Sequence, residues 1–345
     1  MATHDYVIDN STGANVRADI NNVLQAVLTN NSSSSAPSTT AAYMLWADTS
    51  NSLLKMRNSA DNAWITLRGL DGSLTASVDA TINSITVGKG ANSVAGNTVL
   101  GESALDASVS GGNNTAIGKD ALTALTSGAN NTALGFNTLT SNTTASYNTA
   151  VGKDALALNS TGASNSAFGA FSLDANTTGS NNTGFGNNTL GSTTTGSNNT
   201  AVGRQCLEDN TTASNNTGVG YQALKANTTG SNNVAVGALA LDANTTGTAI
   251  VAIGDNALSA NTTANFNTAV GRNALIVNTT GASNVALGTQ TLASNTTASN
   301  NTAVGMSALS ANTTGQYNVA VGNEALVANT TGERNIAIGS YSLDA

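Results

Sequence analysis

Few side chains in this sequence belong to types that commonly perform catalysis or bind metals. The only histidine, His4, lies near the amino terminus, and the only cysteine is Cys206. A single cysteine excludes an intrachain disulfide and a cysteine-rich zinc site. We interpret His4 as having no catalytic role. We interpret Cys206 as a small buried apolar residue, because alanine occupies the same place in most of the repeats described below.

Carboxylates are the remaining candidates for chemistry. Two carboxylates about 5–9 Å apart can hydrolyse a glycosidic bond. The acids at variable repeat positions are sparse, and we expect them to lie on the solvated surface; they are Asp120, Asp154, Asp174, Asp242 and Asp255. Neither a P-loop motif nor a calcium-binding nonapeptide occurs. We therefore predict no catalytic, cofactor-binding or metal-binding residues, no cofactor and no enzymatic activity.

Composition restricts the class of protein further. The 345 residues include 35 glycines, and only 9% are charged and 4% aromatic, against about 25% charged in an ordinary domain. The net charge is −8 and basic residues do not cluster, which argues against a nucleic-acid partner. The first residues, MATHDYVIDN, do not resemble a signal peptide. Because apolar stretches of about 18 residues are missing from the sequence, we expect no membrane insertion.

A strict repeat dominates the chain from residue 97 onward. Glycine recurs at every seventeenth position from Gly101 to Gly339, fifteen times in all. We call this glycine position 0 of its repeat. Leucine always follows at position +4, an apolar residue precedes at −1, and Ala or Gly stands at −2 from Ala116 onward. Position −4 is asparagine in fourteen repeats, with Ile250 as the exception, which we interpret as a packing variant.

Seventeen residues are too few for a helical repeat but suit one coil of a parallel β-solenoid, which rises about 4.8 Å per coil. We predict two short strands per coil, one at N-T-A-V-G and one around A-L, with N-T-T-G as a turn. Leucine then stacks on leucine, valine on isoleucine, and asparagine on asparagine, with amides bonded along the stack. In this interpretation the leucine and the residue at −1 fill the interior. The small residue at −2 forms a face that contacts neighbouring chains.

The unit N-[TS]-A-[VIL]-G resembles the head repeat of YadA-like trimeric autotransporter adhesins over residues 97–345. This resemblance implies a left-handed parallel β-roll of about 15 coils, with three chains in each head. The period of 17 is longer than the unit usual in those heads, and a stalk, membrane anchor and signal peptide are missing. With N-T-T-G between repeats, the chain is more similar to repeat arrays in tail-fibre proteins of marine phages.

Residues 1–96 break the period. We predict an amino-terminal arm, an amphipathic helix and a polar linker in residues 1–40. The apolar face of the helix consists of Val16, Ile20, Val23, Leu24, Val27 and Leu28. Ser11 or Thr12 caps its start and Asn30-Asn31 ends it. We interpret residues 32–40 as flexible.

Three strands, at 42–48, 53–57 and 63–68, are predicted to form a small β-meander in residues 41–70. The meander is similar to amino-terminal modules of phage tail fibres, which attach to the virion. Both tryptophans of the chain, Trp46 and Trp64, lie here, and we interpret them as part of a docking surface. Residues 71–96 are a transition in which residues 85–90 form a first, irregular coil.

Together these features predict an all-β structural fibre of a virion, most similar to a phage tail fibre. The expected partners are two further copies of the chain, other virion proteins through residues 1–70, and a host receptor at or beyond the distal end. We expect assembly in the host cytoplasm and release with the virion. The chain ends within a repeat, which predicts that the natural protein continues past residue 345. The alternatives are a bacterial or algal adhesin of the trimeric autotransporter type and an ice-binding solenoid with threonine ladders.

Overall fold

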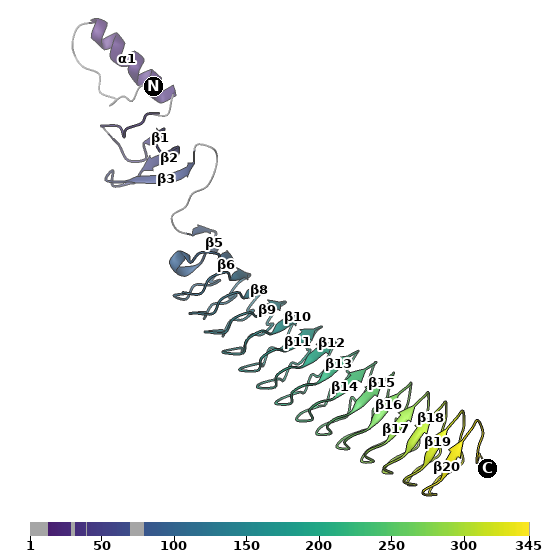
Figure 1. Cartoon of the computed structure of the whole chain (residues 1–345). Coiled ribbons are helices and arrows are strands. Elements are labelled where there is room, and N and C mark those ends of the chain that lie inside the picture. Colours follow the sequence, from purple (N-terminus) through teal and green to yellow (C-terminus); the bar gives the residue numbers. More distant parts are fainter. Residues whose placement is uncertain (1–12, 29–31, 39, 70–78, 345) are drawn as a thin grey trace. The chain divides into compact units, whose positions relative to one another are not determined.

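A computed structural model of the chain describes residues 13–28, 32–38, 40–69 and 79–344 (Figure 1). The chain divides into two compact units, residues 1–80 and 81–345, and each is described by itself. The predicted helix caps, Ser11 or Thr12 and Asn30-Asn31, lie outside the described residues, as does His4.

The first unit contains the predicted helix and meander. Helix α1 spans Gly13–Leu28, and strands β1 (Leu45–Asp48), β2 (Leu53–Arg57) and β3 (Trp64–Gly69) form an antiparallel sheet in the order β1-β2-β3. The interpretation of residues 32–40 as a flexible linker is wrong at Ser33. Its backbone N–H donates to Ala47 O and its carbonyl accepts from Thr49 N, so this segment adds a parallel bridge beside β1.

A buried carboxylate organises the turn that follows β1. The side chain of Asp48 is 1% exposed, and Lys55 Nζ donates to its Oδ2 at 2.7 Å. Ser50 and Asn51 also donate to this carboxylate. Burial by itself raises the pKa of Asp48, but the hydrogen bonds from Lys55, Asn51 and Ser50 outweigh it and hold the pKa well below its ordinary value.

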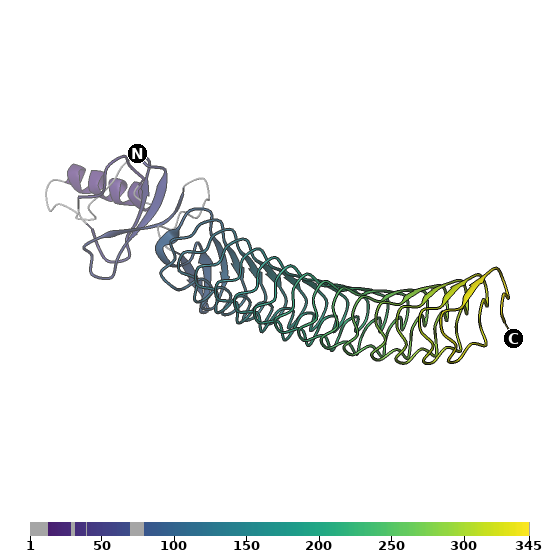
Figure 2. The ribbon, with the colours of Figure 1, turned by 60° about the horizontal axis from the view of Figure 1, so that its bottom comes forward.

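The second unit is the predicted parallel β-solenoid, in which each coil corresponds to one period of the sequence repeat (Figure 2). It begins with β4 (Ala80–Ile82), β5 (Ile85–Gly88) and the 3₁₀ turn η1 (Ala91–Ser93). Fifteen strands follow, one per coil: β6 (Thr98–Gly101), β7 (Thr115–Ile117), β8 (Thr132–Leu134), β9 (Thr149–Val151), β10 (Ser166–Phe168), β11 (Thr183–Phe185), β12 (Thr200–Val202), β13 (Thr217–Val219), β14 (Val234–Val236), β15 (Val251–Ile253), β16 (Thr268–Val270), β17 (Val285–Leu287), β18 (Thr302–Val304), β19 (Val319–Val321) and β20 (Ile336–Ile338).

Each strand from β6 to β20 pairs in parallel and in register with the next, so equivalent residues of successive coils stack. Strand β5 is different, because it pairs antiparallel with β6 through Val87 and Leu100. The prediction that residues 85–90 form a first coil is therefore wrong. This segment covers the edge of the first coil strand, which would otherwise present unpaired backbone groups.

Each coil has one strand, and the prediction of a second strand around A-L is wrong. In the coil of Gly220, the chain leaves the strand with φ 138° at the glycine, and then takes left-handed angles at Gln222 (φ 55°) and Leu224 (φ 54°). A left-handed angle costs a residue such as leucine about 1–2 kcal/mol. Full burial of a leucine side chain contributes about 1.5–3 kcal/mol and offsets this cost.

The N-T-T-G segment forms a turn, as predicted, but its glycine does not supply the left-handed backbone angle that the prediction assumed. Alanine replaces this glycine in four coils, at Ala145, Ala213, Ala264 and Ala298. The left-handed residue lies two positions later, immediately before the asparagine at −4. Asn232, with φ 62°, is an example.

The two faces of the coil strand are reversed relative to the prediction. Alanine at −2 is inside the coil and fully buried, as at Ala235, whereas the larger apolar residue at −1 faces outward. The interior beside −2 is filled by leucine at +4 and the small residue at +3. Cys206 is larger than the alanine usual at +3, and the residue at −2 of the next coil, Gly218, is a glycine. A Cβ atom on Gly218 would lie only 2.5 Å from Cys206 Sγ. The contact between chains predicted for the −2 face is therefore wrong, because that face lies in the chain's own core.

Two columns of buried asparagine line the rest of the interior. At −4, Asn216 Oδ1 accepts from the backbone N–H of Asn233 in the next coil at 3.0 Å, and its Nδ2 donates to Gly230 O at 2.9 Å. At +7, Asn227 Nδ2 donates to Asn210 Oδ1 at 3.1 Å and also to Gly230 O. The predicted asparagine stack is confirmed, with backbone groups as additional partners.

Ile250 interrupts the column at −4. Its backbone N–H still donates to Asn233 Oδ1, but its side chain has no oxygen to accept from the next coil. The side chain is fully buried among the apolar residues of the core, which confirms it as a packing variant.

A first prediction tests the size match between Gly218 and Cys206. The Gly218→Ala variant should lose about 1–3 kcal/mol of local stability, because the added methyl overpacks the site. The Gly218→Ala/Cys206→Ala double variant should recover it, since this pair then equals Ala235 with Ala223 one coil later. Hydrogen exchange of the amides in residues 200–240 measures both effects. Equal loss of protection in the single and double variants would contradict the size match.

A second prediction concerns Asp48. Because its pKa is lowered in the folded state, its stabilising effect is complete above the unfolded pKa, about 3.9, and is lost as pH falls toward the folded value. Urea midpoints followed by tryptophan fluorescence, which reports only on the first unit, should fall between pH 5 and pH 3. Asp48→Asn should be less stable at pH 7 and show a weaker fall. An equal pH dependence in both proteins would refute the role of this carboxylate.

Candidate functional site

An uninterrupted apolar column runs along the outside of the solenoid sheet, and we call it the outer stripe. It consists of the fifteen residues at −1, on strands that line one side of the stack (Figure 1). They are Leu100, Ile117, Leu134, Val151, Phe168, Phe185, Val202, Val219, Val236, Ile253, Val270, Leu287, Val304, Val321 and Ile338. At a spacing of about 4.8 Å the stripe is roughly 70 Å long.

The outer stripe remains substantially exposed in the single chain. Phe185 is 56% exposed, Leu134 44% and Val219 36%. The rings of Phe168 and Phe185 lie 5.4 Å apart, so even the largest members stack on each other along the column. Parallel sheets are normally covered on both faces, and a contiguous apolar patch of this length marks an interaction surface.

The five acids singled out in the sequence are less exposed than predicted. Of the five, only Asp255 is exposed, and its Oδ2 atom lies 3.7 Å from Arg272 Nε. Asp120 is partly buried. Burial acts to raise the pKa of Asp154, but hydrogen bonds from Asn137 and Lys153 outweigh it and lower that pKa. Burial raises the pKa of Asp174 and of Asp242.

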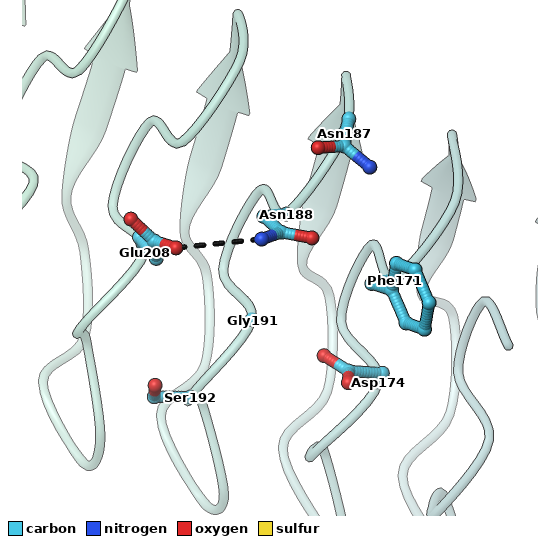
Figure 3. A pocket seen from close by; sticks show the side chains of 7 residues that line it. All are labelled: Phe171, Asp174, Asn187, Asn188, Gly191, Ser192 and Glu208. Atoms are coloured by element: carbon cyan, nitrogen blue, oxygen red, sulfur yellow. Dashed lines mark hydrogen bonds between the residues drawn. The ribbon is translucent and has the colours of Figure 1, made fainter.

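One of these acids shares a pocket with a carboxylate that the sequence interpretation missed. Asp174 and Glu208 line the same surface pocket from coils two repeats apart (Figure 3). Both occupy position +5 of their repeats, and this shared position is the signal that could have identified Glu208. Within the described residues, no three His, Cys, Asp or Glu side chains gather closely enough to hold a metal ion.

Cys206 is fully buried in the apolar core, as predicted. Burial raises the pKa of its thiol to about 12. The thiol is therefore protonated at neutral pH and is a poor nucleophile.

The threonine ladder at position +8 uses its hydroxyl groups within the protein. At position +8, Thr228 Oγ1 donates to Thr245 O of the next coil at 3.0 Å, and Thr211 and Thr245 make the same bond. Hydroxyl protons committed in this way are not available to order water, which weighs against an ice-binding surface formed by this ladder.

In the first unit, Trp46 is buried, so the interpretation as a docking surface is wrong for this residue; Trp64 is partly exposed. Trp46 is 5% exposed and its ring lies 5.2 Å from that of Trp64. Lys55 and Arg57 place their cations over these rings. The exposed apolar side chains of this unit include Ile20 and Leu24 on α1.

Across the described parts of the chain, no helix has the length and apolar character needed to cross a membrane. No protein-family model, curated protein or solved structure matches the chain.

Proposed function

We propose that this protein is the structural subunit of a virion fibre of the phage tail-fibre type, in which three parallel chains associate through their outer stripes. The observation that carries the proposal is the outer stripe itself. It repeats with the period of the solenoid, so a second copy in the same register presents an apolar side chain opposite each apolar side chain. A structural role agrees with the regular, small polar residues that cover the rest of the coil.

The size of the stripe supports association with further copies of the chain. Its fifteen side chains expose on the order of several hundred Å² per chain, comparable with the ~800 Å² per partner of a standard protein interface. The residues at −3 lie on the same face and are threonine in most coils, with valine or isoleucine in others. The three-chain arrangement rests on the resemblance of the repeat to trimeric adhesin heads.

In this proposal residues 1–70 attach the fibre to the particle, and the solenoid extends toward the host receptor at or beyond its distal end. The first unit supports the assignment because its sequence is not periodic and its helix presents exposed apolar residues, Ile20 and Leu24. In this proposal the buried Trp46 stabilises the unit.

A third prediction tests the outer stripe. Light scattering should give a mass three times the 34.1 kDa of one chain. The Val219→Asp/Val236→Asp variant should dissociate, because it would bury two charges in the interface. The matched control, Thr229→Asp/Thr246→Asp, adds the same charges to the exposed turns of neighbouring coils and should stay trimeric. A monomeric parent protein, or a trimeric Val219→Asp/Val236→Asp variant, would overturn the interface.

A fourth prediction tests the division of roles. Particles should incorporate a fibre that lacks residues 220–253, because removal of two whole coils preserves the register of the stack. The fibre should shorten by roughly 10 Å. Fibres that lack residues 1–70 should fail to join particles. Normal loading of such fibres, measured by quantitative mass spectrometry of purified particles, would refute the attachment role.

A further inference from the structure

A surface pocket of about 500 Å³ interrupts the regular wall of the solenoid. It is lined by Phe171 and Asp174 of one coil, Asn188 and Ser192 of the next, and Glu208 of the third. In Figure 3 the two carboxylates lie on opposite sides of Gly191, which has no side chain to separate them. The pocket exists because position +5 of the middle coil is glycine.

The fold does not require glycine at this position. A Cβ on Gly191 would meet nothing closer than Asp174 Oδ1 at 3.6 Å, an ordinary contact, and its φ is not left-handed. Among the glycines of the described coils, Gly191 alone combines these two properties. The equivalent residues of earlier coils include Thr123 and Thr140, so larger side chains fit the same place.

Hydrogen bonds from its own coil and from the preceding coil hold the Glu208 side chain in place. Glu208 Oε1 accepts from Asn188 Nδ2 at 3.4 Å and from Gln205 Nε2 at 3.2 Å. Glu208 Oε2 accepts no hydrogen bond and lies 3.8 Å from Lys225 Nζ. A buried carboxylate oxygen without a donor is unfavourable, and a hydroxyl group of a ligand would supply one.

The pocket also contains one aromatic ring. Phe171 lines the pocket, and Lys153 Nζ lies over its ring, 4.6 Å from the ring centroid. An aromatic face packs well against the C–H groups of a sugar ring, while carboxylate and amide oxygens accept hydrogen bonds from its hydroxyl groups. A ligand with hydroxyl groups at its edges and an apolar face matches this lining.

We propose that the pocket at Gly191 binds a saccharide, with Phe171 against the sugar ring and Asp174 and Glu208 accepting from its hydroxyl groups. The residues that carry the two carboxylates stand two coils apart, and both side chains reach toward the coil of Gly191 between them. The inference deepens the proposed adsorption role, because it assigns the receptor to the class of glycans.

The test uses the full chain on an immobilised array of neutral, amino and acidic glycans, followed by calorimetry with the glycan that gives the strongest signal. Gly191→Thr fills the pocket with the residue found in other coils and should weaken binding at least tenfold. Phe171→Ala should weaken binding similarly. The control Ala293→Thr makes the same kind of change at position +5 of a distant coil and should bind like the parent protein.

Circular dichroism of each variant confirms that the solenoid is retained. Failure of the parent protein to bind any glycan, or unchanged binding by Gly191→Thr, would overturn the proposal. Cleavage of the glycan during the experiment would indicate a catalytic site and would also contradict the proposal. The mass from light scattering is independent of these results, so the saccharide site can fail while the fibre assignment stands.

Discussion

Hydrogen bonds from each coil to the next are the interaction on which this structure depends. One coil encloses a single large apolar side chain, and its burial contributes only about 1.5–3 kcal/mol, whereas ordering each backbone residue costs about 1–2 kcal/mol. Bonds between coils are not confined to the strand. Leu224 N donates to Ala240 O in the turn, and Thr228 N donates to Thr245 O in the following segment. The buried asparagines extend the same pattern to the interior, where their amides satisfy backbone groups that water cannot reach.

This dependence explains why the repeat keeps its period without a slip. An inserted residue would displace the asparagine columns, the leucine stack and the strand pairing together. Some substitutions in the interior are matched by a neighbouring residue of complementary size. Gly218 opposite Cys206 and Gly184 opposite Ser172 and Thr189 keep the interior volume within limits. Ile250 replaces hydrogen bonding by apolar burial in a single coil.

The same narrow interior places the larger apolar residues outside. With leucine and two asparagines enclosed, the inner side of the strand has room for a methyl group and little more. Valine, isoleucine and phenylalanine at −1 are therefore exposed along the outer stripe. The close packing inside one coil and the exposure of the outer stripe thus follow from one geometrical limit. Variable residues such as Asp174, Gly191 and Glu208 lie away from these constraints, so a pocket can form there without disturbing the stack.

The sequence by itself determined the period, the parallel stacking, the buried leucines and the asparagine column, because a strict repeat places equivalent residues one above another. It also predicted α1 and the meander from their apolar patterns. The tertiary structure alone decided which face of the strand is buried. A short strand with alanine at −2 and valine at −1 is apolar on both faces, so its pattern does not distinguish inside from outside. The positive φ of the leucine at +4 could not be predicted from the sequence, because leucine rarely adopts a left-handed backbone conformation. The pocket at Gly191 depends on side chains from three coils, and their proximity follows only from the stacked geometry.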